Sequence, residues 1–151
     1  MEKMKNLLYK FLTTLLITMI ASCESYQIHG DLDGFWQVQS IENRETGETT
    51  NCNGDIYYSF QRELVMLSYV SPEMPKGQMK ENHIAYFSHE DGQIAMTEFR
   101  IYLDKNGKPS PLPKLEKFGI YSTYSIFHVE NLDSKSLILK SEKARIVFRK
   151  Y

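Results

Sequence analysis

From residue 35 to residue 151 the chain is a succession of short segments rich in Ile, Val, Tyr and Phe, separated by clusters of Gly, Asn, Asp and Pro. Several segments alternate between apolar and polar residues; Ile56, Tyr58 and Phe60, for example, fall on one face. A period of two is typical of a β-strand with one buried face, and the intervening residue types favour turns. We therefore expect eight strands, at 35–42, 55–61, 64–70, 83–89, 94–103, 122–130, 136–141 and 144–150.

One segment departs from this strand pattern. Between 110 and 119, prolines precede a Lys-Leu-Glu-Lys-Phe sequence and Gly119 follows it. Proline in the first turn and glycine just past the end are typical of a short helix. Eight strands in about 120 residues, most of them joined by hairpin-length links, predict an all-β, antiparallel barrel or sandwich with one short helix before the last three strands. Periodicity alone leaves the choice between barrel and sandwich open.

The first 22 residues have the layout of a secretion signal. Lys3, Lys5 and Lys10 give a basic start, and 11–20 is an apolar run diluted by threonines. Ten helical residues, at about 1.5 Å each, are too short for a hydrocarbon core about 30 Å thick. We interpret residues 1–22 as a signal peptide rather than as a membrane-spanning helix.

The apolar run ends in Ile-Ala-Ser-Cys at 20–23, which resembles the lipobox of bacterial lipoproteins. The resemblance implies cleavage before Cys23 and lipidation of its thiol, so that the acyl chains anchor the protein to a membrane. Residues 23–32 would then form the lipidated tether and 33–151 the folded domain. An ordinary secretory signal with a cysteine near the cut is the alternative. We expect an outer-membrane lipoprotein of the bacterial envelope that faces either the periplasm or the exterior.

Net charge and cysteine content exclude two further classes of protein. Removing residues 1–22 takes away three Lys and one Glu, which changes the net charge from −1 to −3. A nucleic-acid partner is excluded because such partners require a basic footprint. The chain has two cysteines, and lipidation of Cys23 would leave Cys52 alone in a polar loop. A disulfide framework is therefore excluded, and the redox state of Cys52 stays open.

The sequence contains no recognisable catalytic or cofactor motif: no nucleophile elbow, phosphate-binding loop, dinucleotide-binding glycine pattern or zinc-protease helix. His83 and His89 fall on one face of a predicted strand, but six residues of extended chain place them about 20 Å apart. They cannot share one metal ion. We expect no enzymatic activity, no cofactor and no metal site.

The first strand opens with Gly34-x-Trp36, which includes the only tryptophan of the chain. This pattern resembles the G-x-W signature of the lipocalin and wider calycin barrels. The layout from lipobox to C-terminal Lys-Tyr is similar to that of short lipocalin-like lipoproteins of Bacteroidetes. The resemblance implies an eight-stranded up-and-down β-barrel whose floor is closed by the indole, with a basic residue of the last strand lying across it. Arg149 is the first candidate for that residue and Arg145 the second.

Two functions follow from these expectations. The first is a non-catalytic envelope lipoprotein whose barrel binds a small apolar or amphiphilic molecule. The candidate pocket-lining residues, chosen for their aromatic or thioether side chains, are Tyr58, Phe60, Met66 and Tyr86. The alternative is a module that binds an envelope protein, as an inhibitor or accessory subunit, with a barrel filled by its own side chains. The Pro-containing loops 71–82 and 105–113 would then form the contact surface.

Overall fold

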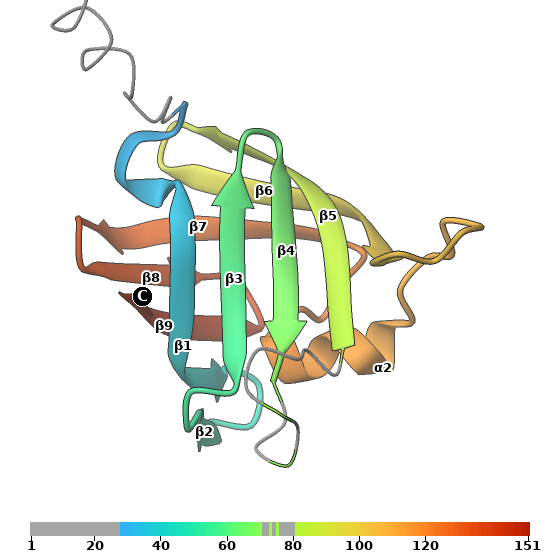
Figure 1. The fold of residues 1–151 in the computed structure, drawn as a ribbon. Coiled ribbons are helices and arrows are strands. Elements are labelled where there is room, and N and C mark those ends of the chain that lie inside the picture. Colours follow the sequence, from blue (N-terminus) through green and yellow to red (C-terminus); the bar gives the residue numbers. More distant parts are fainter. Residues whose placement is uncertain (1–27, 71–72, 74, 76–80) are drawn as a thin grey trace, which may run out of the picture.

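The computed structural model describes residues 28–70, 73, 75 and 81–151 (Figure 1). These residues form one antiparallel sheet that closes on itself. Its strands are β1 (Gly34–Asn43), β2 (Thr49–Asn51), β3 (Ile56–Gln61), β4 (Leu64–Tyr69), β5 (Glu81–Glu90), β6 (Gln93–Ile101), β7 (Tyr124–Leu132), β8 (Ser136–Lys140) and β9 (Ala144–Lys150). The predicted signal peptide and Cys23 lie outside the described residues, as does most of loop 71–80.

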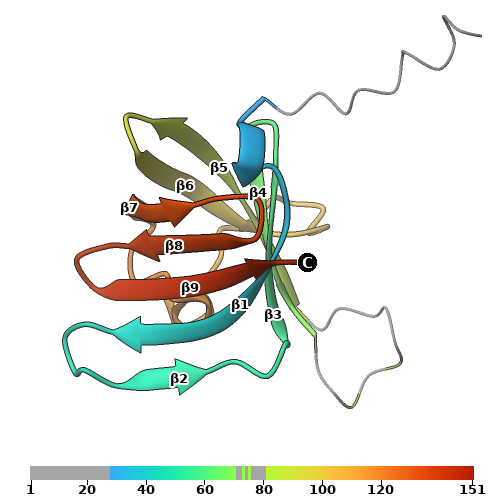
Figure 2. The ribbon, with the colours of Figure 1, turned by 90° about the vertical axis from the view of Figure 1, so that its left-hand side faces the viewer.

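Eight of the strands make the barrel. Each strand from β3 to β9 pairs with its neighbour in sequence, and β9 pairs with β1 to close the ring. The short β2 pairs with the second half of β1 and lies beside the barrel (Figure 2). The predicted eight-stranded up-and-down barrel is therefore confirmed, and the sandwich alternative is wrong.

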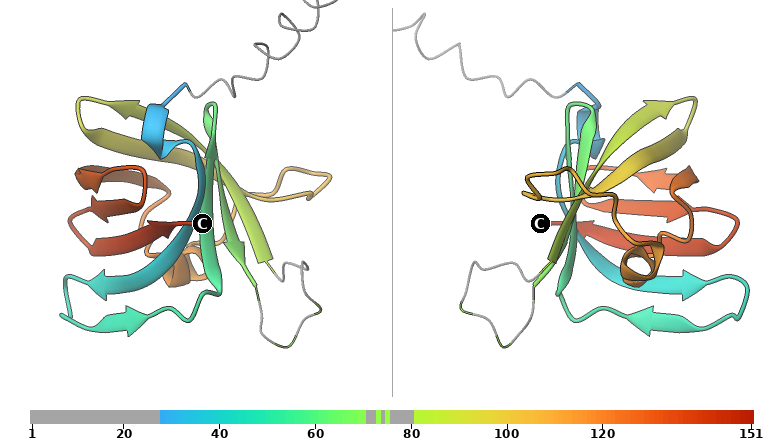
Figure 3. Two further views of the ribbon diagram at one scale, coloured as in Figure 1. Left: turned by 60° about the vertical axis from the view of Figure 1, so that its left-hand side comes forward. Right: turned by 90° about the vertical axis from the view of Figure 1, so that its right-hand side faces the viewer.

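On one edge, strand β1 pairs with both β3 and β2 because it bends. Its first residues, Gly34–Gln37, pair with β3, whereas Ser40–Glu42 pair with β2. The pairing with β9 shifts register between Val38 and Ser40, which marks a β-bulge. A bulge adds one residue to a strand and increases its bend. The strand therefore runs from one wall of the barrel into the other, as the two views of Figure 3 show.

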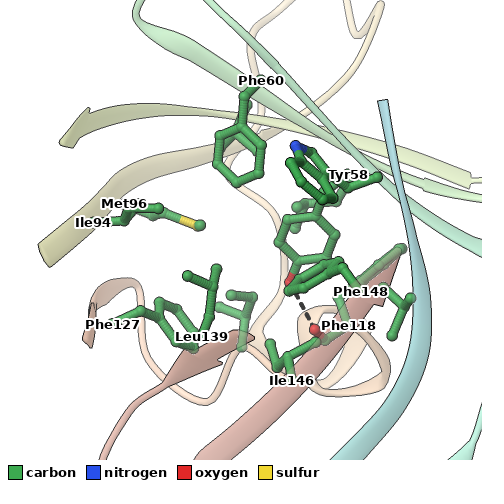
Figure 4. Close-up of a cluster of buried hydrophobic side chains, with 14 of the residues drawn as sticks. Tyr58, Phe60, Ile94, Met96, Phe118, Phe127, Leu139, Ile146 and Phe148 are labelled. Atoms are coloured by element: carbon green, nitrogen blue, oxygen red, sulfur yellow. Dashed lines mark hydrogen bonds between the residues drawn. The ribbon is translucent and has the colours of Figure 1, made fainter. Parts of the chain in front are cut away.

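Side chains fill the middle of the barrel (Figure 4). Tyr58 packs edge-on against Phe148, with ring centroids 5.0 Å apart, and Phe60 packs edge-on against Phe87 at 5.1 Å. Edge-to-face packing suits the charge distribution of aromatic rings. The other large, fully buried side chains are Leu32, Trp36, Leu67, Ile94, Met96, Leu115, Phe118, Ile120 and Phe127. Among the described residues, the tryptophan and six of the seven phenylalanines are therefore core, whereas Tyr58 is the one buried tyrosine of eight.

The two ends of the barrel are covered by different elements. The 3-10 helix η1 (Gly30–Leu32) lies at the end where the chain enters β1. At the opposite end, α2 (Leu112–Leu115) continues as the 3-10 turn η2 (Glu116–Phe118) and stops at Gly119, whose φ is +82° (Figures 1 and 3). Proline at the start and a left-handed glycine at the stop confirm the predicted short helix. In the part of the chain that the structure describes, no helix has the length and apolar character to span a bilayer.

Candidate functional site

The end of the barrel beside η1, which we call the floor, is built around Trp36. The indole is fully buried, and its Nε1 donates a hydrogen bond to the Leu32 carbonyl at 2.7 Å. The Lys150 ammonium stands 4.2 Å from the centre of the indole ring. The same ammonium donates to the carbonyls of Asp31 at 2.7 Å and Asp33 at 2.5 Å. A single lysine thus joins the last strand, the indole and the entering chain.

The glycine of the G-x-W pattern has a specific role in this arrangement. Gly34 has a φ of +118°, in the region that L side chains rarely adopt. A Cβ at this position would stand 3.3 Å from both Cε and Nζ of Lys150. The missing side chain therefore leaves room for the lysine to cross the indole.

The prediction that Arg149 covers the indole is wrong. Alternation along β9 turns Phe148 and Lys150 toward the interior and Arg149 outward. Arg149 instead donates from Nε to the Gln37 Oε1 at 2.6 Å on the outer face. Arg145, the second candidate, has the same outward parity. The parity of β9 was readable from the sequence, and it identifies Lys150.

The candidate pocket-lining residues divide into two pairs. Tyr58 and Phe60 point into the barrel, where they are packed rather than adjacent to empty space. Burial raises the pKa of Tyr58, so its hydroxyl stays protonated, and it donates to the Phe118 carbonyl at 2.6 Å. Tyr86 and Met66 lie on the outer face, and Tyr86 is 49% exposed, so their assignment to an interior pocket is wrong.

The error at Tyr86 has a physical reason. In β5 both faces of the strand carry apolar residues, because Ala85 and Phe87 point inward while Ile84 and Tyr86 point outward. A period of two then identifies two faces without saying which is buried. Only the closure of the sheet decides which row of side chains faces the core.

The end of the barrel beside α2 and η2, which we call the mouth, contains a cavity of about 510 Å³. The cavity lies between the β1–β2 hairpin, the adjoining ends of β3 and β4, and η2. Its lining residues are Ile41, Asn43, Glu48, Thr50, Asn51, Cys52, Asp55, Ile56, Tyr69, Glu116, Lys117 and Tyr121. A second cavity, of about 430 Å³, shares Tyr121 and extends toward the start of β7 and the β8–β9 turn. We refer to the first as the mouth cavity.

Two polar groups in the wall of the mouth cavity are unusual. The Oδ1 atom of Asp55 is buried and has no hydrogen-bond partner among the described residues. Burial and the nearby Asp55 charge raise the pKa of Cys52 to about 11. The thiol is therefore protonated near neutral pH and is a poor nucleophile and metal ligand in that form.

A buried polar network holds the short helix to the barrel. His83 is fully buried; its Nδ1 is 2.7 Å from the Ser110 Oγ, and its Nε2 is 3.0 Å from the Glu81 Oε1. Glu81 also forms an ion pair with Lys117 and lies 3.7 Å from the Lys114 ammonium. Strand β5 is thereby linked to both ends of the α2–η2 segment. Sequence reasoning missed this network because its members come from separate segments.

The protonation states of the network follow from its surroundings. Burial, together with the charges of Lys117 and Lys114, lowers the pKa of His83 despite the opposing effect of Glu81, so the imidazole is neutral near pH 7. Burial raises the pKa of Glu81, but the hydrogen bonds from Lys117 and His83 outweigh it, and the net shift is downward. Glu81 is therefore ionised. Hydroxyl, imidazole and carboxylate follow one another as in a hydrolase triad, but Ser110 is only 5% exposed and lines neither cavity described above.

A family model described as a lipocalin-like domain matches residues 17–151. The chain belongs to this lipocalin-like family. One similar solved structure is a lipocalin-like protein from Bacteroides uniformis ATCC 8492, with 21% identity and a TM-score of 0.60 over 81% of this chain and 100% of that one. An uncharacterized protein from Bacteroides eggerthii DSM 20697 has 22% identity and a TM-score of 0.60 over 80% of this chain and 99% of that one. No curated protein matches the chain.

The lipocalin-like fold has, at its mouth, a cavity in which a small molecule can bind. Within residues 28–70, 73, 75 and 81–151, no group of three or more His, Cys, Asp or Glu side chains is arranged to hold a metal ion. The lining of the mouth cavity is mixed: seven of its twelve residues are polar or charged, and the other five are apolar or aromatic.

Proposed function

We propose that this lipocalin-like protein is a non-catalytic, membrane-tethered lipoprotein of the bacterial envelope that binds a small amphiphilic molecule in the mouth cavity. The observation that carries the proposal is the cavity of about 510 Å³. Its volume lies in the range of about 300–1,000 Å³ that is typical of ligand sites. Ile41 and Ile56 contribute apolar side chains to the lining, and Asp55 contributes a carboxylate.

The filled interior supports the mouth, rather than the centre of the barrel, as the binding site. Tyr58 and Phe148 occupy the space near the axis, and the Tyr58 hydroxyl is already bonded to Phe118. A ligand at the centre would have to displace these packed rings. Close-packed interiors resist such changes, because a displaced ring gives up dispersion attraction to all the atoms around it.

The position of the two barrel ends fits a tether. The described chain begins at Ile28 beside the floor, and the mouth lies at the far end (Figure 1). A lipid on Cys23, only a few residues earlier, would hold the floor toward the membrane. The mouth would then face the surrounding medium, where a ligand can reach it.

Ligand binding is tested by native mass spectrometry of protein purified from its own envelope. We expect a bound mass, and we expect Asn51→Trp, which places a large ring on the cavity wall, to remove it. Thr49→Trp is the matched control, because Thr49 is also exposed on β2 but does not line the cavity. A consistently empty protein, or a bound mass that persists in Asn51→Trp, would contradict the proposal.

The tether is tested by fractionation of cells that express the full chain. We expect Cys23→Ala to move the protein from the membrane fraction to the soluble fraction. Cys52→Ala is the control and is expected to stay with the membrane. A Cys23→Ala protein that remains membrane-bound would show that the anchor lies elsewhere.

A second candidate function is binding to an envelope protein, and the outer face of the barrel favours it. Leu64, Tyr86 and Tyr124 lie in one row across β4, β5 and β7, with Thr97 of β6 between the two tyrosines. All three large side chains are between 38% and 57% exposed. Such clusters are common at protein contact surfaces. We expect Tyr86→Ser to abolish co-purification of any partner, whereas Asn51→Trp should not affect it.

A further inference from the structure

The lining of the mouth cavity carries an excess of negative charge. Glu48, Asp55 and Glu116 line it, and none of the three forms an ion pair with another described residue. Among the described lining residues, the one basic side chain is Lys117, and it is paired with Glu81. Within this part of the chain, the carboxylates of the lining therefore have no partner of opposite charge.

One of these carboxylates is oriented so that it lacks a partner. Asp55 is the residue directly before β3, and its Oδ1 is buried without a hydrogen-bond donor among the described residues. Buried polar atoms are nearly always hydrogen-bonded, and an unbonded one raises the free energy of the folded state. Oδ1 itself has almost no accessible surface, so a donor from a bound molecule reaches this carboxylate at its other oxygen.

The aromatic wall is also compatible with a positive charge. The Lys117 ammonium already stands 4.6 Å from the centre of the Tyr69 ring, which lines the cavity. The faces of aromatic rings attract cations through the ring quadrupole. Burial and the nearby Glu116 raise the pKa of Tyr121, so the hydroxyl of this second ring stays neutral near pH 7.

We propose that the mouth cavity takes a small organic cation, an amine with an apolar body. The ammonium group donates to Asp55, and the apolar body contacts Ile41, Ile56 and the tyrosine rings. This inference rests on the proposed function, because it names the ligand class for the same cavity. A neutral amphiphile would gain the apolar contacts alone, and an anion would stand beside three carboxylates of its own sign.

The test is isothermal titration calorimetry of the lipidated protein in detergent, with three probes of similar size. Phenethylamine is the cation, phenethyl alcohol the neutral analogue and phenylacetate the anion. We expect phenethylamine to bind at least about tenfold more tightly than phenethyl alcohol, because a hydrogen bond to a charged group is stronger than a neutral one. Phenylacetate is expected to bind more weakly than either, and added salt should weaken only the amine.

Single substitutions test which carboxylates cause the preference for the amine. Asp55→Asn keeps the shape of the side chain and removes its charge, so we expect the advantage of the amine over the alcohol to fall severalfold while alcohol binding persists. Asp91→Asn is the control: it makes the same charge change in the exposed β5–β6 turn, where asparagine suits the φ of +50°. Glu116→Gln, at an exposed position on η2, is a second variant that is expected to reduce the advantage by a smaller factor.

The outcomes separate the two proposals. Equal affinity for amine and alcohol, or tighter binding of phenylacetate, overturns the cationic class and leaves small-molecule binding standing. An amine preference that survives in both Asp55→Asn and Glu116→Gln also overturns it. Failure of all three probes to bind overturns the cationic class, and an additionally empty native protein overturns the proposed function as well.

Discussion

The floor and the mouth close the same barrel in different ways. At the floor, one indole and one lysine meet three backbone carbonyls, and each of their polar groups has a partner. At the mouth, a short helix buries Leu115 and Phe118 but is positioned by a chain of charged and titratable groups, and a cavity remains beside it. The comparison indicates that the floor stabilises the fold, whereas the mouth, where a cavity remains beside the short helix, is the part available for binding.

Both ends nevertheless depend on a glycine that allows close approach. Gly34 leaves space for Lys150 at the floor, and Gly119 leaves space at the mouth, where a Cβ would stand 2.7 Å from the Ile146 Cδ1 and 3.2 Å from the Ile41 Cγ2. In both places the glycine also has a positive φ. The predictions that follow are chosen to separate the contributions of the two ends.

The largest expected effect is at the floor. Trp36→Ala removes a fully buried indole together with its hydrogen bond to Leu32, and should lower the free energy of unfolding by about 3–5 kcal/mol. Urea denaturation followed by circular dichroism measures it. Phe35→Ala, at a neighbouring position that is 36% exposed, is the control and should have a much smaller effect. Similar losses for the two variants would contradict the role assigned to the indole.

At the mouth, Gly119→Ala is expected to be the most damaging small substitution. The positive φ alone should lower the free energy of unfolding by about 1–3 kcal/mol. The clash with Ile146 and Ile41 adds to this loss. Gly92→Ala is the matched control, because Gly92 has a φ of +72° and no heavy atom within 4 Å of the added Cβ. If thermal or urea denaturation gives the same loss of stability for both variants, the close contact at Gly119 does not contribute to the loss.

Lys150→Met tests the cation at the floor. The variant keeps an apolar stem over the indole but removes the charge and both hydrogen bonds to the carbonyls of Asp31 and Asp33. We expect a loss of about 1–3 kcal/mol in urea denaturation. Arg149→Met serves as the comparison, because Arg149 is exposed and bonded only to Gln37. A larger loss at Arg149 than at Lys150 would reverse the assignment.

The smallest expected effect is a pH dependence that originates at the mouth. The pKa of His83 is lower in the folded protein than its ordinary value of 6.5, so the unfolded chain binds the proton more tightly. Stability is therefore full above pH 6.5 and is lost as the pH falls toward the lowered pKa. Glu81 acts in the same direction at lower pH, since its pKa is also below its ordinary value of 4.5.

Urea midpoints at pH 7.0 and 5.5 measure this dependence, and His83→Gln should reduce the difference between them. His89, on β5 at the floor end, also has a pKa lowered by burial, and His89→Gln measures its separate share. His128→Gln, at an exposed position on β7, is the control substitution. A pH dependence that is unchanged in His83→Gln would show that the mouth network does not contribute.

Local pattern was sufficient for the eight barrel strands and the short helix, but it missed the short strand β2. The run Ile56, Tyr58 and Phe60 alternates cleanly, and the structure turns all three inward. Pattern was insufficient where both faces are apolar, as at Ile84 and Tyr86, and where bulges interrupt the pairing, as between Val38 and Ser40. In these places several arrangements satisfy the same local preferences.

The candidate site depended still more on closure of the sheet. Cys52 and Asp55 meet Tyr69, Glu116 and Tyr121 only because the short helix folds across the barrel end. The link between His83 and Ser110 likewise joins residues 27 positions apart. A single sequence carries no local signal for such pairings.

The amino-acid order by itself determined the eight barrel strands and the short helix, because strand periodicity and turn chemistry act over a few neighbouring positions. The choice of a barrel over a sandwich, and the place of Trp36 at its floor, were predicted only through the resemblance to lipocalins. The tertiary structure decided that Tyr86 faces solvent and that an acidic cavity remains at the mouth. The reason is that side-chain surroundings are set by which distant strands meet when the sheet closes, and that meeting is a property of the whole fold.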